Sequence, residues 1–412
     1  QIPPPSRSPA LPSAPSDFFP HSADLSLIHH ELFAGICSGD TSLGILEVDP
    51  SKIATYPCEH DPCLVAKIKT RFPSSPIDLN VMDLVEADCD LVVRRIRYHQ
   101  ADKIRRTVLI TAGFPCQDLS SAKKGARLGL LGKRSCLFAA VVLIISALTK
   151  LKDELHIDIA FLVENVASMS ANWKRLLNKA FGVTAKDIDL SQTCPVRRKR
   201  LLWTNISGIS MSPSKPVDSK SCLDKGWTTA HDIGILPANK FHRWDCFLRA
   251  HGPGSPPELP LDFYTLSPHA YTASNLTFKA DTPPEILAAI KSRLHEAQAL
   301  GDYQFTPKAR EPLIRWIHQE GGLQYLRPLH GLERARALSY PVNLLVDTSS
   351  HVPFSENDWT LISAMGNCFP LPSIVDALRP IATALKQNSR PTLSPSTLAD
   401  SNWNDVFTRL GL

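Results

Sequence analysis

A proline–cysteine pair carries the most reactive side chain in the sequence. In GFPCQ the thiol of Cys116 follows Pro115, directly after the apolar run TVLITAG. A thiolate is a strong nucleophile, and nearby positive charge or a turn rich in backbone N–H groups favours it. The next segment is rich in basic side chains: Lys123, Lys124, Arg127, Lys133 and Arg134. Taken alone, this segment is equally well a surface loop with an incidental thiol.

A carboxyl group and two guanidinium groups come next along the chain. Glu164 and Asn165 lie in ENV, at the end of the apolar run IAFLV, and Arg198 and Arg200 lie in RRKR, before LLW. Ligands of open α/β sheets bind at the carboxyl ends of the strands. A nucleophile, an acid and fixed positive charges at such ends are suited to one polar substrate.

Three further stretches at strand ends favour a nucleoside pocket. The glycines of ELFAGICSG, Gly35 and Gly39, let backbone approach a ligand, and Phe33 offers a flat apolar face. A carboxylate at Glu59 can accept from ribose hydroxyls, and one at Asp83 can accept from an adenine amino group. Each signal is weak alone, because glycine turns and single acids are common in loops. No lysine of the phosphate-gripping type accompanies them, which favours a nucleoside cofactor without a polyphosphate.

Strands and helices alternate between residues 25 and 206. Strands are predicted for LIHHELFAG, KIATYPCE, RRTVLITAG, IAFLVENV and KRLLWTNI, and helices for CLVAKIKTRF and for the apolar run LFAAVVLIISAL. This alternation is typical of a doubly wound α/β sheet. The sheet would hold the reactive residues along one edge.

Changes in composition divide the chain into five parts. We expect a Pro/Ser-rich disordered tail over 1–24, a catalytic and cofactor-binding domain over 25–206, a smaller loop-rich lobe over 207–330, a return to the first domain over 331–390, and a tail over 391–412. The lobe contains the predicted helix PPEILAAIKSRLHEAQAL and the basic–aromatic stretch KFHRWDCF. The return contains the predicted helix LPSIVDALRPIATAL, bent at Pro380.

Bulk composition bounds the function only loosely. The chain has 412 residues, 43% of them hydrophobic, and a net charge of +5, which is compatible with a polyanionic partner. Its 10 cysteines lack a disulfide-like spacing, and no run is long enough to span a bilayer. Cys58, His60 and Cys63 have metal-ligand types but no second pair, so no metal is predicted. A start at Gln1 rather than methionine indicates a fragment or a processed product, with other domains upstream.

These stretches, taken in series, resemble the DNA (cytosine-5) methyltransferases. ELFAGICSG is similar to their first cofactor-binding motif, GFPCQ to the nucleophile motif, LVENV to the base-binding motif and RRKRLLW to the arginine-x-arginine motif. GLERARALSYPVNL and MGNCFPLPSIVDAL are similar to the last two motifs of that family. The resemblance covers roughly Glu31 to Asn205 and Gly331 to Leu385, and implies a Rossmann-like domain with a smaller target-recognition lobe.

The resemblance also implies a reaction and its participants. Cys116 would attack carbon 6 of a flipped-out cytosine, carbon 5 would take the methyl group of S-adenosyl-L-methionine, and Glu164 would hold the N3 and N4 edge of the ring. Arg200 would reach the base oxygen, Arg198 would orient the nucleophile or a phosphate, and Asn165 would shape the strand end. The implied cofactor contacts are Phe33, Gly35, Gly39, Glu59, Asp83, Pro115 and Asn367. Double-stranded DNA would be the partner, with no membrane.

The basic segment after Cys116 would then act as a lid. Its lysines and arginines would bind DNA phosphates while the segment covers the flipped base. Its glycines would serve as hinges: Gly125, Gly129 and Gly132.

Departures from the family pattern leave other interpretations open. Cys37 and Ser38 interrupt the usual glycine run, Glu31 replaces an aspartate, Val196 stands where most relatives carry glutamine, and Cys368 removes a hydroxyl. The Val196 departure and QDLS favour the eukaryotic de novo branch over restriction-linked enzymes, and with it a nuclear location rather than a microbial cytoplasm. Alternatives are a catalytically silent DNA-binding or regulatory homologue and a tRNA cytosine-5 methyltransferase. A homo-oligomer also stays open.

Overall fold

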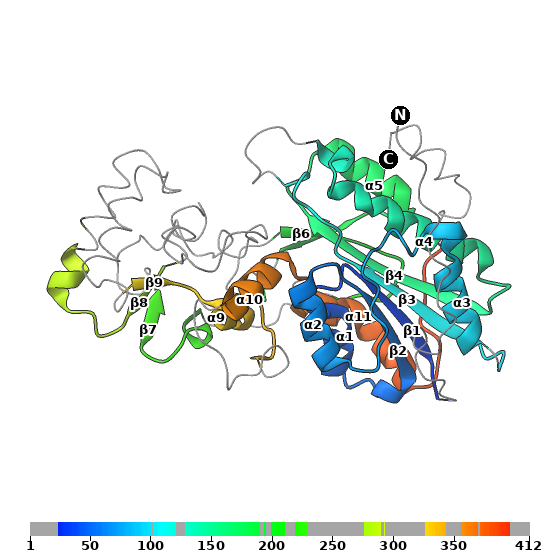
Figure 1. The fold of residues 1–412 in the computed structure, drawn as a ribbon, viewed down its shortest axis with the longest axis horizontal. Helices are drawn as coiled ribbons and strands as arrows, with labels where there is room; N and C mark the ends of the chain where they lie inside the picture. Colours follow the sequence, from blue (N-terminus) through cyan, green and yellow to red (C-terminus); the bar gives the residue numbers. More distant parts are fainter. Residues whose placement is uncertain are drawn as a thin grey trace.

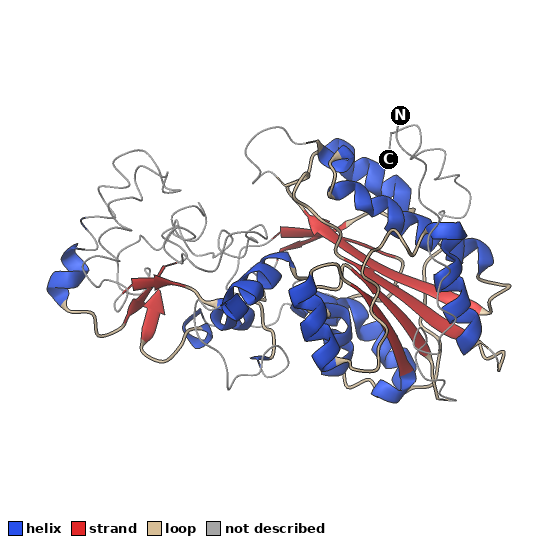
Figure 2. Cartoon of the chain, in the orientation of Figure 1, coloured by secondary structure: helices blue, strands red, loops and turns tan. Residues whose placement is uncertain are grey.

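The computed structural model of the chain contains a larger lobe built on a six-stranded sheet and a smaller lobe that includes a three-stranded sheet (Figure 1). It describes residues 24–100, 102–120, 128–189, 193–194, 199–210, 219–229, 276–289, 292, 326–342, 356–369 and 371–395. The predicted α/β class is confirmed, because helices cover both faces of the large sheet (Figure 2).

The large sheet has the strand order β2-β1-β3-β4-β6-β5. Its strands are β1 (Leu27–Leu32), β2 (Ile53–Cys58), β3 (Arg106–Ala112), β4 (Ile157–Val166), β5 (Lys186–Asp189) and β6 (Lys199–Thr204). The first four in spatial order run parallel, and β6 runs antiparallel to both of its neighbours. All of the predicted strands are therefore confirmed, whereas β5 was not predicted.

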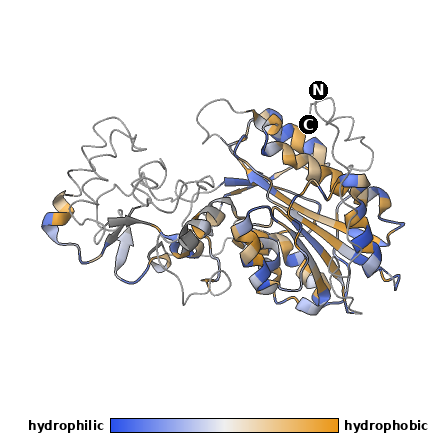
Figure 3. Cartoon of the chain, viewed as in Figure 1, coloured by the Kyte–Doolittle hydropathy of each residue, from blue (hydrophilic) through white to orange (hydrophobic). Residues whose placement is uncertain are grey.

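Alternating residues of the central strands bury themselves in two different cores. Ile28, Val108 and Ile110 pack toward α3 (Asp90–His99), α4 (Phe138–Leu151) and α5 (Ala171–Phe181). Leu27 and Leu109 pack toward α1 (Ser38–Ile45) and α11 (Leu371–Lys386). The strands β3 and β4 are buried on both faces and read as nearly continuous apolar runs, whereas β1 also buries His29, His30 and Glu31, so the sheet carries both apolar and polar colours (Figure 3).

Capping residues mark the ends of several helices. In α2 (Pro62–Arg71), the Asp61 carboxylate accepts from the Cys63 backbone N–H at 2.9 Å, and Pro62 occupies the first turn. Helix α5 starts after the cap Ser170 and ends at Gly182, which has φ 63°. Both helices that were predicted between residues 25 and 206 are confirmed, as α2 and α4. Short 3₁₀ helices cover Pro50–Lys52, Glu86–Cys89, Gly129–Leu131, Ser135–Leu137 and Ser219–Cys222.

Within the described residues, no single helix has both the length and the apolar character needed to cross a membrane; one bent pair, Thr360–Gly366 with Leu371–Lys386, meets the test by length and composition only.

The smaller lobe includes the antiparallel strands β7 (Trp227–Thr229), β8 (Leu276–Lys279) and β9 (Leu326–Pro328). Of the helix predicted there, backbone 284–289 is helical, while KFHRWDCF lies outside the described residues. Helices α9 (Gly331–Ala337) and α10 (Glu356–Asn367) lead back to α11, which continues as one helix through Pro380. Beyond α11, the Ser394 N–H donates to the Asn205 carbonyl at 2.7 Å, so this stretch pairs with the segment that directly follows β6.

Candidate active site

The strand ends that carry the predicted site residues lie at one edge of the sheet. Strands β2, β1, β3 and β4 are parallel and adjacent, so the segments that follow them emerge side by side (Figure 1). The Ala34 N–H, just beyond β1, donates to the Cys58 carbonyl at the end of β2 at 2.9 Å. The loops after these two strands are thereby joined directly.

Gly35 and Glu59 meet at this edge, as the nucleoside interpretation requires. The Gly35 N–H donates to Glu59 Oε2 at 2.8 Å, and the His60 and Asp61 N–H groups donate to Oε1 at 2.9 Å. Burial alone would raise the pKa of Glu59, but hydrogen bonds from His60, Asp61 and Gly35 outweigh it and lower that pKa below its ordinary value. Glu59 is therefore a charged acceptor beside a glycine turn, which fits a ribose.

Gly39 has a packing role. A Cβ at Gly39 would lie 2.9 Å from His29 Cε1 and 3.0 Å from Thr111 Oγ1, so only glycine lets α1 rest on the sheet. The Gly39 N–H also donates to Glu31 Oε1 at 2.7 Å, and the Asp40 N–H donates to Oε2 at 3.2 Å. Burial is the main reason that the pKa of Glu31 rises to about 8.

The other predicted cofactor residues take three different positions. Phe33 is half-buried with φ 56°, in the turn directly after β1. Asp83 is exposed and accepts from Asn80 Nδ2 at 2.9 Å. Two apolar side chains near it in sequence, Leu79 and Met82, are 60% and 43% exposed, so this surface can receive a flat ring. Asn367 is the last residue of α10, and its side chain lies outside the description.

Cys116 sits in a tight turn after β3. Its side chain is half-buried and not part of a disulfide, and its carbonyl accepts from the Leu119 and Ser120 N–H groups at 3.0 and 2.9 Å. Two distant side chains hold the preceding backbone: Asn165 Nδ2 donates to the Phe114 carbonyl at 2.9 Å, and Ser135 Oγ to the Pro115 carbonyl at 2.9 Å. Asn165 was predicted to shape the end of its own strand, and its hydrogen bond to the exit of β3 is a further contact. Nothing in the local sequence pointed to Ser135.

Glu164 and Arg200 form an ion pair at the same edge. Arg200 Nε lies 2.5 Å from Glu164 Oε1, and both side chains are largely buried. The antiparallel register that pairs Val166 of β4 with Arg200 of β6 explains the approach. Several predicted residues lie outside the described ranges: Lys123, Lys124, Arg127 and Arg198.

The end of the segment after Cys116 is closely packed. A Cβ at Gly129, which has φ +62°, would collide with the indole of Trp173, and one at Gly132 would collide with the carboxyl group of Asp118. The Gly129 N–H also donates to the Asp118 carbonyl at 3.2 Å, which brings the two ends of the segment together. Gly129 and Gly132 therefore anchor the segment, and the prediction that they act as hinges needs correction. Gly125 lies outside the described residues.

The basic residues that can be placed near this anchor are on the surface. Lys133 and Arg134 are exposed, whereas Asp118 is buried against the backbone that carries them. The Arg134 and Ser135 N–H groups point to Asp118 Oδ2 at 3.4 and 3.5 Å, at the start of the helical stretch that becomes α4. The acid of this segment is thereby directed inward and two of its cations outward.

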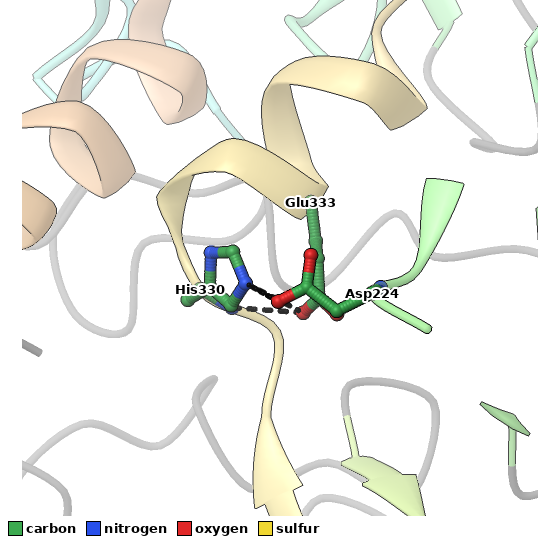
Figure 4. Close-up of side chains that lie close together, drawn as sticks. All are labelled: Asp224, His330 and Glu333. Carbon is green, nitrogen blue, oxygen red and sulfur yellow. Dashed lines mark hydrogen bonds and ion pairs between the residues drawn. The ribbon is translucent and has the colours of Figure 1, made fainter. Parts of the chain in front are cut away.

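A side-chain cluster lies where the segment before β7 meets the start of α9. Asp224, His330 and Glu333 point toward one another (Figure 4), and among the described residues they are the one group of possible metal ligands whose ligand atoms all lie within 4.8 Å. However, His330 Nε2 is 2.7 Å from Asp224 Oδ2, and Arg336 Nη1 donates to Asp224 Oδ1 at 2.8 Å. The hydrogen bond from His330 holds the pKa of Asp224 well below its usual range. A guanidinium already neutralises this carboxylate, so the cluster is a hydrogen-bonded junction between the segment before β7 and the start of α9.

In a comparison with known protein families, one segment of the chain matches a family. Residues 72–188 match the family described as C-5 cytosine-specific DNA methylase. That segment contains Cys116, Glu164 and Asn165, and the anchored loop between them. No curated protein sequence matches the chain.

Solved structures that resemble the chain have low sequence identity to it. A Spodoptera frugiperda DNMT2 mutant is 15% identical with a TM-score of 0.47, covering 86% of this chain and 98% of its own. A putative E. coli prophage DNA modification methyltransferase is 16% identical with a TM-score of 0.43, covering 86% and 98%. S. pombe Dnmt2 methyltransferase is 14% identical with a TM-score of 0.43, covering 88% and 100%.

Proposed function

Residues 72–188 of this chain match the C-5 cytosine-specific DNA methylase family, and from that match we propose that the protein transfers a methyl group from S-adenosyl-L-methionine to carbon 5 of cytosine in double-stranded DNA. The observation that carries the proposal is the Glu164–Arg200 ion pair at the end of β4, beside the β3 exit that carries Cys116, at the same sheet edge as Gly35 and Glu59. A nucleophile, an acid–guanidinium pair and a nucleoside-type pocket at one edge fit this reaction.

Cys116 supplies the nucleophile. Carbon 5 of cytosine is a poor nucleophile by itself, and addition of the Cys116 thiolate to carbon 6 converts the ring to an enamine that attacks through carbon 5. Bound S-adenosyl-L-methionine supplies the electrophilic methyl group. Loss of the carbon 5 proton to a base then lets the ring expel the thiolate, which regenerates Cys116 and releases 5-methylcytosine.

Glu164 holds the pyrimidine during this addition. Its carboxyl group engages the N3 and N4 edge of the ring and favours the protonated ring as the adduct forms. Arg200 fixes the orientation of that carboxyl group through the 2.5 Å ion pair of its Nε. Its Nη1 donates to the Lys199 carbonyl at 2.9 Å, and its Nη2 donates to the base oxygen. Arg198 and Asn367 keep the roles that the resemblance implies for them, in orienting the nucleophile and in closing the cofactor pocket.

The cofactor pocket is formed by the loops after β1 and β2. Glu59 accepts from the ribose hydroxyls, and the glycine turn at Gly35 lets backbone approach the ligand. Phe33, Asp83, Gly39 and Pro115 complete the proposed contact set. The half-buried ring of Phe33 faces the apolar part of the nucleoside, and Asp83 accepts from the adenine amino group.

The substrate base must leave the duplex to reach Cys116, since carbon 6 is inaccessible in a stacked pair. The exposed cations Lys133 and Arg134, together with Lys123, Lys124 and Arg127, contact the phosphates of the DNA around the extruded base.

Methyl transfer from labelled S-adenosyl-L-methionine to duplex DNA tests the proposal. Wild type should label DNA, and Cys116→Ala should reduce labelling by about a thousandfold or more. Cys136→Ala is the matched control, because Cys136 is also a half-buried thiol near the site, and it should label DNA at the wild-type rate. Retained labelling in Cys116→Ala would contradict the assigned nucleophile.

Two further arms separate the alternatives. A covalent adduct on DNA containing 5-fluorocytosine should form in wild type, whereas a catalytically silent homologue forms none. Labelling of tRNA in preference to duplex DNA would replace the proposed substrate with an RNA.

A further inference from the structure

The hydroxyl of Tyr340 is buried between two segments that are far away in the sequence. It lies 2.6 Å from Ser38 Oγ and 2.7 Å from the Phe369 carbonyl oxygen, and Tyr340 is 2% exposed. A phenol has one proton and a carbonyl can only accept, so Tyr340 donates to Phe369 and Ser38 donates to Tyr340. Burial raises the pKa of Tyr340 well above its ordinary value, which keeps this donor protonated.

Ser38 is the first residue of α1 and immediately follows the glycine turn of the proposed cofactor pocket. Cys37, just before it, has φ 56°, and the next two N–H groups are held by Glu31. Together, the Glu31 carboxyl group and the Tyr340 hydroxyl fix the first turn of α1. The conformation of the preceding loop therefore depends on both groups.

Phe369 connects the same hydroxyl to the segment that carries the nucleophile. A Cβ at Gly113 would lie 3.2 Å from the ring of Phe369, so the glycine before Phe114 packs directly on it. Phe369 also lies two residues after Asn367, the residue expected to close the pocket. One buried hydroxyl thus links the start of α1, the turn after α10 and the exit from β3.

We propose that Tyr340 is a positioning residue for the cofactor pocket, holding Ser38 and Phe369 so that the loops around the nucleoside keep their binding conformation. This inference rests on the proposed function, because it takes S-adenosyl-L-methionine as the occupant. Tyr340 is buried behind the loops and acts through them. Loss of its hydroxyl should therefore weaken cofactor binding and leave the rate at saturating cofactor nearly unchanged.

Tyr340→Phe removes both hydrogen bonds and keeps the ring. Calorimetric titration with S-adenosyl-L-methionine should show a Kd raised by about tenfold. The matched control is Tyr98→Phe, because Tyr98 is 40% exposed and contacts His99 edge-on; its Kd should stay within about twofold of wild type. With labelled cofactor, Tyr340→Phe should show a raised KM and a kcat within about twofold of wild type.

Ser38→Ala is the second variant, since it removes one of the two hydrogen bonds and retains the phenol. It should raise the Kd by about threefold, and the double variant should bind as weakly as Tyr340→Phe alone, because the two hydroxyls act as one unit. Equal affinity of wild type and either folded single variant would overturn the inference, as would a lower kcat with an unchanged KM. Absence of cofactor binding by wild type would instead refute the proposed function.

Discussion

The ionisation of Glu31 should give the protein a distinct dependence of stability on pH. Glu31 ends β1, is 1% exposed and accepts from the N–H groups of Gly39 and Asp40. Burial, with a further contribution from the nearby charge of Asp40, raises its pKa from 4.5 to about 8, although the hydrogen bonds and Arg71 act in the opposite direction. Between these two values the folded chain binds a proton that the unfolded chain has released.

The sign and size of the effect follow from that proton. Because the folded state binds more protons, its stability falls as the pH rises, by about 1.4 kcal/mol per pH unit. The contribution of Glu31 to the free energy of unfolding is fully present below its pKa in the unfolded chain and is lost as the pH rises through about 8. Over about two pH units inside this window the loss is about 3 kcal/mol.

Two buried histidines act in the opposite direction at lower pH. Burial lowers the pKa of His29 to about 3 and that of His30 well below its ordinary value of 6.5. As the pH falls below 6.5, both histidines bind a proton in the unfolded chain before they do so in the folded chain. Their contributions to the free energy of unfolding therefore rise with pH and level off near pH 6.5. Subtracting the profile of a Glu31 variant from that of wild type cancels these shared contributions.

Urea unfolding of wild type and Glu31→Gln, at constant ionic strength and several pH values, measures the difference. The free energy of unfolding of wild type minus that of Glu31→Gln should fall with the stated slope between about pH 4.5 and about pH 8, and be flat on either side. Glu47→Gln, at a surface carboxyl group with 86% side-chain exposure, controls for the substitution itself. A difference that does not change with pH would refute the reasoning.

Two other substitutions test how the nucleophile segment is held. Gly129→Ala should cost about 3 kcal/mol in urea unfolding, because it adds a collision with Trp173 to the strain of φ +62°, whereas Gly208→Ala, at φ +73° in open space, should cost about 1 kcal/mol. Similar losses at the two glycines would contradict the packing argument. Asn165→Ala should slow methyl transfer about ten- to a hundredfold and leave the Kd for the cofactor within about twofold, because it frees the Phe114 carbonyl. Asn178→Ala, which removes hydrogen bonds to Ala185 and Trp203, should cost stability without changing kcat, and an equal kcat loss in both variants would assign Asn165 a purely structural role.

The sequence predicted the sheet well because its strands are buried on both faces. A run such as TVLITAG is too short for a typical helix and is followed by turn residues, so a strand is the natural prediction. Parallel pairing then brings the ends of such strands to one edge of the sheet. The predicted neighbours Gly35 and Glu59 do meet there. Strand β5, with the residues KDID, has no apolar alternation, and only its pairing with β6 defines it.

Contacts between residues far apart in the sequence could not be predicted from local sequence patterns. The approach of Arg200 to Glu164 depends on the antiparallel register of β6, which no spacing rule specifies. Gly129 and Gly132 were interpreted as hinges because glycine permits movement, but glycine also permits close packing, and the side chains that fill the space at Trp173 and Asp118 are not local in sequence. The contact of Ser38 with Tyr340 joins residues 302 positions apart.

One construction recurs around both halves of the site. Three buried side-chain donors reach backbone carbonyls in the segments beside the reactive groups: Asn165 to Phe114, Ser135 to Pro115 and Tyr340 to Phe369. The loops that they hold leave ordered strands or helices and would otherwise lose conformational entropy on binding substrate or cofactor. Because these hydrogen bonds order the loops when the chain folds, the entropy is lost before the ligands bind. The free protein therefore already holds the nucleophile turn and the nucleoside pocket close to their binding conformations. Asn165 and Ser135, which hold the nucleophile turn, should therefore affect kcat, whereas Tyr340, which holds the cofactor pocket, should affect the affinity for the cofactor.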